Sequence, residues 1–164
     1  MKKILIAVSG IILSFSGYSQ DFALLRKINF FSGNDYKRYE KEVHSCADYI
    51  LKVPVSGDSN RVLALQTVIK WMRGTPDFTF ELDNSVINLT RKDEKVMGVY
   101  MAAMTKYVLE NPGISGNPED VTYHSFLLFL DYCENPANGV LITRRIQKAI
   151  DAKNDHRLKK YLQL

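Results

Sequence analysis

Residues 117–134 read NPEDVTYHSFLLFLDYCE, the stretch with the clearest helical signals in the chain. Asn117 is a preferred N-cap residue, and Pro118 suits the first helical position because that position needs no backbone N–H donor. The two acidic residues that follow are stabilised by the positive end of the helix. Residues 126–130 are all apolar. The predicted helix is therefore apolar nearly all round and belongs at the centre of a helical core.

Helical spacing of apolar residues also marks the chain on both sides of this central stretch. We expect helices within 21–31, 34–53, 58–74 and 90–111, and a weaker final pair near 143–153 and 155–163. The residues expected to cap them are Asn34 or Asp35, Asp58 or Ser59, Thr90 (in a capping box with Asp93), Thr143 and Asp155. The apolar face expected for the helix at 58–74 consists of Val62, Leu65, Ile69 and Met72.

Residues 75–89 lack this spacing, and we expect an extended loop there that packs Phe78 and Phe80 on the helices. The predicted fold class is all-α: a compact bundle or a short array of antiparallel helical hairpins, with about five to six helices after the N-terminal segment. The tripeptide Glu-Asn-Pro recurs at 110–112 and 134–136. That recurrence leaves an α-solenoid as the alternative to a bundle.

Residues 1–19 read MKKILIAVSGIILSFSGYS and predict a bacterial-type secretory signal peptide. Two lysines precede an apolar run of about 12 residues, which is shorter than the roughly 20 that a membrane-spanning helix needs. Gly17 and Ser19 supply the small residues expected before the cut, so cleavage is predicted before Gln20. Residues 20–164 then form a single helical domain in the periplasm or outside the cell. An uncleaved N-terminal anchor is the alternative.

The chain contains two cysteines, Cys46 and Cys133. An oxidising compartment would allow a disulfide between them, closing a loop of about 88 residues. The alternative is a pair of buried free thiols that pack as small hydrophobic residues. Both cysteines are expected on helices far apart in the sequence, so spacing alone does not decide between these states.

Motifs that carry chemistry are absent from the sequence, which contains no GxGxxG, GxxxxGK[ST], GxSxG, HExxH or CxxC pattern and no EF-hand loop. His44 and Asp48 are four residues apart and share a helix face, which favours a surface hydrogen bond. His124 adjoins Ser125, but neighbouring residues on a helix point apart and form no nucleophile–base pair. No zinc spacing joins the two histidines to the cysteines. The sequence therefore predicts no cofactor and no metal.

The charge distribution is the most specific feature after residue 19. Residues 107–143 contain five acidic residues and no Lys or Arg, whereas residues 144–164 contain seven basic residues and two acidic ones. One interpretation is a basic C-terminal tail that docks on an anionic surface, either lipid headgroups or an acidic partner. The residues of that surface would be Arg144, Arg145, Lys148, Arg157, Lys159 and Lys160. The favoured interpretation is internal: the tail packs on the acidic segment and the charges largely neutralise each other.

Composition and motifs together favour an exported, non-enzymatic helical protein that binds another protein or belongs to an envelope assembly. The alternative is an enzyme or a small-ligand-binding protein whose site forms between helices. The aromatic residues mostly occupy core spacings, as do Met97, Met101 and Met104, so we expect no nucleic-acid partner. We expect the partner to be a protein whose identity the sequence does not give, and peripheral contact with a membrane is also compatible with the sequence.

Export predicts that the chain is cleaved between Ser19 and Gln20. N-terminal sequencing or intact mass of the protein from its native host should show a mature chain that starts at Gln20, because the small residues before it suit signal peptidase. A cytosolic chain that retains Met1 would contradict this prediction.

Overall fold

The computed structural model describes residues 22–82, 84–90, 93–114 and 117–164. Within these ranges the secondary structure is entirely helical, which confirms the predicted all-α class. The predicted signal peptide, residues 1–19, lies outside the described residues. The α-helices are α1 (Phe22–Leu25), α2 (Gly33–Arg38), α3 (Glu40–Ile50), α4 (Ser59–Met72), α5 (Asn84–Thr90), α6 (Glu94–Glu110), α7 (Pro118–Glu134), α8 (Arg144–Asn154) and α9 (Leu158–Leu162), and the 3₁₀ turns are η1 (Pro112–Ile114) and η2 (Pro136–Asn138).

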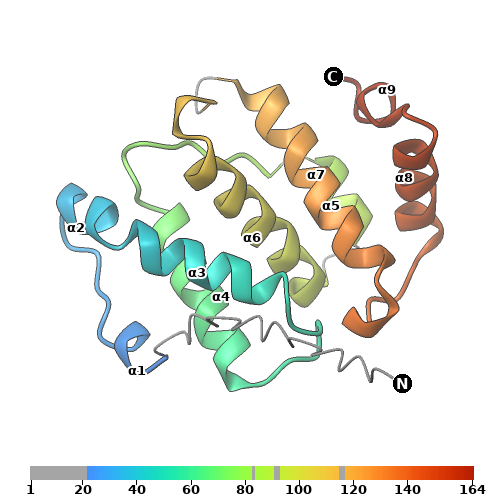
Figure 1. Ribbon diagram of the computed structural model, residues 1–164. Coiled ribbons are helices and arrows are strands. Elements are labelled where there is room, and N and C mark those ends of the chain that lie inside the picture. The colour runs from blue at the N-terminus through green and yellow to red at the C-terminus, as the bar shows by residue number, and fades with distance from the viewer. Residues whose placement is uncertain (1–21, 83, 91–92, 115–116) are drawn as a thin grey trace, which may run out of the picture.

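The helices form a bundle around the antiparallel pair α6 and α7 (Figure 1). Helices α3 and α4 pack on one side of α6, and α8 packs on the opposite side of α7. Helix α5 covers α6, and α9 turns back onto α7. The long α6 and α7 therefore separate an N-terminal helical layer from the basic C-terminal helices.

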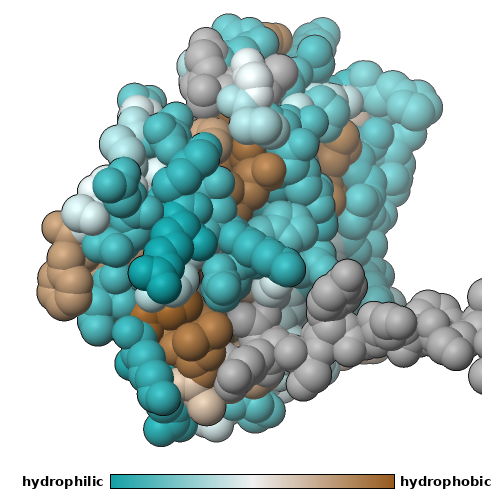
Figure 2. Space-filling model, turned by 60° about the vertical axis from the view of Figure 1, so that its left-hand side comes forward, coloured by the Kyte–Doolittle hydropathy of each residue, from teal (hydrophilic) through white to brown (hydrophobic). Residues whose placement is uncertain are grey.

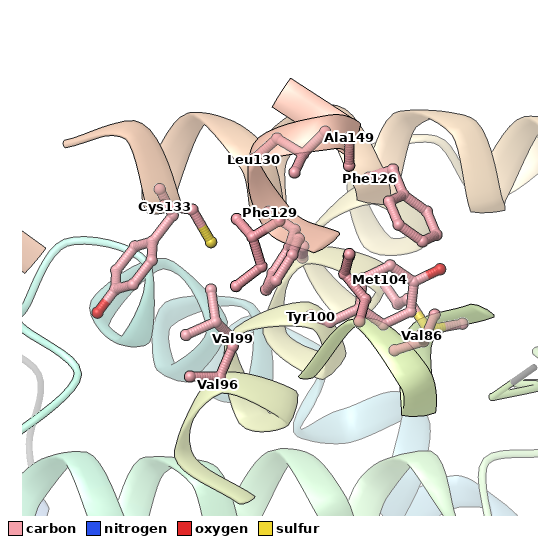
Figure 3. Packing of buried hydrophobic residues seen from close by; sticks show 14 of the residues in the cluster. Val86, Val96, Val99, Tyr100, Met104, Phe126, Phe129, Leu130, Cys133 and Ala149 are labelled. Atoms are coloured by element: carbon pink, nitrogen blue, oxygen red, sulfur yellow. The ribbon is translucent and has the colours of Figure 1, made fainter. Parts of the chain in front are cut away.

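The core between α6 and α7 is aromatic (Figure 3). The ring of Tyr100 meets Phe126 and Phe129 edge-on, at centroid distances of 5.1 and 6.0 Å. All three side chains are buried, and edge-to-face pairs of this kind add to the stabilisation from apolar burial. The predicted central position of the helix at 117–134 is confirmed.

Three predicted helix starts are confirmed by their caps. The side chain of Asn117 accepts a hydrogen bond from the Asp120 backbone N–H, and Thr143 accepts one from Ile146. Asp58 likewise accepts from the backbone N–H groups of the second and third residues after it. Each of these caps acts within three residues of its own position, so a local pattern suffices to predict it.

Two other predicted caps were wrong. The helix predicted to start at Asn34 or Asp35 begins earlier, as α2, at a capping box made by Ser32 and Asp35, and a break at Tyr39 separates α2 from α3. Thr90 ends α5 instead of capping the next helix, and Asp93 caps α6 through the N–H groups of Lys95 and Val96.

The predicted cap of the last helix was wrong as well. Asp155 closes α8, and α9 begins after Arg157 without a side-chain cap. His156 between them has a positive φ of 57°, a conformation that ends a helix.

The buried face of α4 also differs from the prediction. Ala64, Val68 and Trp71 are fully buried; of the predicted face, Leu65 and Met72 pack partly buried against the core, whereas Val62 is 55% exposed. The reason is tertiary: the Trp71 indole donates a hydrogen bond to the Tyr36 carbonyl at 3.2 Å, which turns this side of α4 inward.

The segment at 75–89 combines a correct prediction with an incorrect one. Residues 75–82 are not helical, and Phe78 and Phe80 pack against the ring of Trp71, as expected. Residues 84–89 belong to helix α5 instead of a loop, because Val86 and Leu89 are buried against the core.

The two neighbouring positions Leu128 and Phe129 provide a test of the core. Phe129 is fully buried and Leu128 only partly. Phe129→Ala should lower the free energy of unfolding by about 3–5 kcal/mol, because it removes ring contacts and leaves a cavity. Leu128→Ala should cost clearly less. Urea unfolding of both variants checks this; equal losses would contradict the burial difference.

Candidate functional site

The sequence predicted that His44 would pair with Asp48 on its own helix. In the structure, His44 instead pairs with a carboxylate of another helix. Its Nε2 lies 2.9 Å from Oε1 of Glu110 on α6. Lys106 donates to the same Glu110 oxygen at 2.5 Å and to Asp48 at 2.8 Å, and Lys52 donates to the other Asp48 oxygen. These contacts form a polar clamp between α3 and α6, in which each carboxylate faces a basic group.

The polar clamp lowers the pKa values of its two carboxylates, Asp48 and Glu110. Partial burial alone would raise the pKa of Asp48, but hydrogen bonds from Lys106 and Lys52 outweigh it and lower that pKa below its ordinary value. For Glu110, the hydrogen bonds from Lys106 and His44 likewise outweigh desolvation and lower the pKa. Groups held in the charged form in this way stabilise the fold and are poor proton donors.

His124 lies in a second cluster, between α6 and α7. Its ring stacks on Tyr107 at a centroid distance of 4.7 Å, and its Nε2 is 3.7 Å from Asp120. Tyr107 donates a hydrogen bond to Asp120 at 2.6 Å; burial first and this bond second raise the pKa of Tyr107 to about 12. Ser125 is buried, with no hydrogen-bond partner for its hydroxyl among the described residues. The cluster joins two helices and holds no activated nucleophile.

Both cysteines are buried thiols that are not joined by a disulfide, Cys46 on α3 and Cys133 on α7. Burial raises the pKa of each thiol to about 12. A thiol that stays protonated at neutral pH is a poor nucleophile and a poor metal ligand. No three His, Cys, Asp or Glu residues gather to hold a metal ion in the described ranges.

Arg61 is a buried charge that sequence analysis missed. It is almost fully buried on α4, and its guanidinium donates a hydrogen bond to the Lys95 carbonyl at 3.5 Å. Its Nε has no hydrogen-bond partner among the described residues. Neither of the surface hollows described below reaches it, so Arg61 links α4 to the start of α6 without offering an accessible site.

The C-terminal helices attach to the bundle through an apolar face. Ile146, Ala149 and Ile150 of α8 and Leu158 of α9 are buried. Lys153 adds ion pairs to this attachment: its ammonium contacts Asp131 at 2.6 Å and also Glu134, both on α7. Although partial burial disfavours the ammonium, these carboxylates raise its pKa above the ordinary value.

The other basic residues of α8 and α9 stay on the surface. They are Arg144, Arg145, Lys148, Arg157, Lys159 and Lys160, here called the basic surface, and all are exposed. Only Arg157 forms an ion pair with a described carboxylate, Asp155 of its own segment. Lys159 lies over the ring of Tyr123, and Arg145 donates to the Asn88 carbonyl at 2.8 Å. Among the described residues, the acidic segment at 107–143 therefore forms ion pairs with one cation of the tail, Lys153, and with none of the basic surface.

Two shallow hollows adjoin the basic surface and share Tyr161. One, of about 410 Å³, is lined by Arg145 and by residues of α5 and α7; the other, of about 430 Å³, is lined by Lys148, Arg157 and Lys160. The apolar floor of the first consists of Leu89 and Phe126, which are both buried. Because both hollows are shallow and open to solvent, they suit contact with a partner's surface better than enclosure of a small molecule.

Comparison with protein-family models, with curated proteins and with solved structures finds no match to this chain. None of the helices in the described ranges has the length and apolar character needed to cross a bilayer.

The polar clamp predicts a specific pH dependence. Because Asp48 and Glu110 have lowered pKa values in the folded state, they add stability above their unfolded pKa values, and this is lost as the pH falls from about 5 to 3. Lys106→Met should cost about 1–2 kcal/mol near neutral pH and less in acid. Urea unfolding at several pH values checks this against the exposed control Lys70→Met. A cost that does not change with pH would contradict the prediction.

Proposed function

We propose that the protein is an exported, non-enzymatic helical module that binds an anionic partner through its basic surface on α8 and α9. The observation that carries the proposal is the lack of neutralisation: the apolar face of these helices is buried, yet among the described residues one of the seven cations of the tail, Lys153, forms ion pairs with carboxylates of α7. Exposed cations of one sign attract anionic partners and raise their association rate. The location outside the cytoplasm depends on residues 1–19.

The state of the candidate catalytic residues supports binding over catalysis. His44 and His124 are engaged in contacts between helices, and neither lines either of the two hollows beside the basic surface. Cys46 and Cys133 are buried thiols with raised pKa values. A catalytic site needs a nucleophile or base that a substrate can reach.

Lys148 and Lys160 provide the sharpest test of the basic surface. Both are exposed and line the same hollow. Lys148→Glu/Lys160→Glu should weaken binding to fluorescent poly-L-glutamate and to phosphatidylglycerol vesicles by more than about tenfold, because each cation near an anionic surface contributes about 1 kcal/mol. Binding of the unchanged protein should weaken steeply as salt rises.

A matched control distinguishes the effect of the basic surface from the effect of the protein's net charge. Lys41→Glu/Lys70→Glu makes the same change in charge at exposed positions on α3 and α4, and it should bind both probes nearly as the unchanged protein does. Equal losses for the two double variants, or no salt-sensitive binding to either probe, would overturn the proposed function.

A further inference from the structure

The connection between η2 and α8 exposes two large apolar side chains. Leu141 is 82% exposed and Ile142 is 39% exposed. The connection that carries them passes from the end of η2 to the start of α8 at the outer edge of the bundle (Figure 1). Exposed leucine and isoleucine side chains side by side are unfavourable in water unless another surface covers them.

The base of this connection is firmly held. Asn138 is buried; its side chain donates to the Tyr132 carbonyl at 2.8 Å, and its own carbonyl accepts from the Val55 N–H at 2.8 Å. Gly139 then turns the chain with a positive φ of 68°, and Val140 packs partly against the core. The fold therefore presents Leu141 outward from an anchored position.

The first turn of α8 follows closely after these apolar residues, and it carries basic residues where acidic ones are usually favoured. Arg144 and Arg145 occupy the positive end of the helix, where acidic residues are favoured and cations are not. The guanidinium of Arg145 has the Asn88 carbonyl as a partner, whereas Arg144 forms no ion pair with a described carboxylate. An anion bound at this turn would meet both the helix end and the arginines.

We propose that residues 141–145 form a membrane-docking segment for an anionic lipid surface. Leu141 and Ile142 enter the boundary between headgroups and acyl chains, and Arg144 and Arg145 bind lipid phosphates at the start of α8. This inference rests on the proposed function and specifies its partner. A bilayer interface receives projecting apolar side chains without a matching pocket, whereas a protein partner would need one.

Among the described residues, the two other large apolar side chains that are more than half exposed lack this combination. Phe31 is 89% exposed and Val62 55% exposed, on the loop before α2 and on α4. On the face formed by the N-terminal helices, apolar side chains lie in separate places between hydrophilic ones (Figure 2). Neither residue is followed by two arginines at a helix start. They therefore provide matched controls for exposed apolar area.

The test compares Leu141→Ser/Ile142→Ser with Phe31→Ser/Val62→Ser. The first double variant should bind vesicles of phosphatidylcholine mixed with phosphatidylglycerol more than about tenfold more weakly, because it removes the inserting side chains. It should keep its binding to poly-L-glutamate and its melting temperature, since both residues are exposed. The control variant should bind the vesicles as the unchanged protein does.

Two further measurements address insertion and phosphate contact. Leu141→Trp should show a blue shift of its fluorescence with the mixed vesicles and none with phosphatidylcholine alone; Trp71, the single tryptophan, is buried and stays a constant background. Arg144→Glu should weaken vesicle binding more than Arg73→Glu, which makes the same change at an exposed position after α4.

The outcomes separate the two proposals. Vesicle binding that is unchanged in Leu141→Ser/Ile142→Ser and no blue shift in Leu141→Trp would overturn the lipid inference, while loss of poly-L-glutamate binding in Lys148→Glu/Lys160→Glu would still support an acidic partner. If the basic surface variants also bind as the unchanged protein does, the proposed function fails as well.

Discussion

The packing of α6 against α7 is the interaction on which the other elements depend. Tyr100, Phe126 and Phe129 fill the space between the two helices. The outer sides of the same pair receive α3 and α4 on one side and α8 on the other. Most of the stability of a helix in a protein comes from packing of its apolar face, so the outer helices need this pair as a support.

Helices α8 and α9 are held to the bundle by their apolar side chains, and this leaves most of their basic side chains exposed for binding. Burial of Ile146, Ile150 and Leu158 holds the helices, while surface ion pairs add only about 0–1 kcal/mol each. The tail thus needs few of its charges for stability. Lys153 alone reaches carboxylates of α7, and the basic surface remains accessible to a partner. The internal interpretation of the tail was therefore correct for its apolar side and wrong for most of its charge.

The sequence predicted those features that depend on neighbouring residues. Asn117, Asp58 and Thr143 cap their helices as expected because a cap bonds to N–H groups two or three residues away. The predictions failed where two local signals competed: Thr90 and Asp93 both suit an N-cap, and only Asp93 serves as one. The break at Tyr39 had no local signal.

By itself the sequence determined the helical class, the central position of α7 and the segregation of basic residues at 144–164, because composition and spacing control how a chain buries apolar surface. Tertiary structure decided which side of α4 faces inward, that His44 meets Glu110 instead of Asp48, and which cations stay exposed. It also decided that Leu141 projects into solvent. These outcomes depend on contacts between residues far apart in the chain, and no spacing along one helix determines what a neighbouring helix places opposite it.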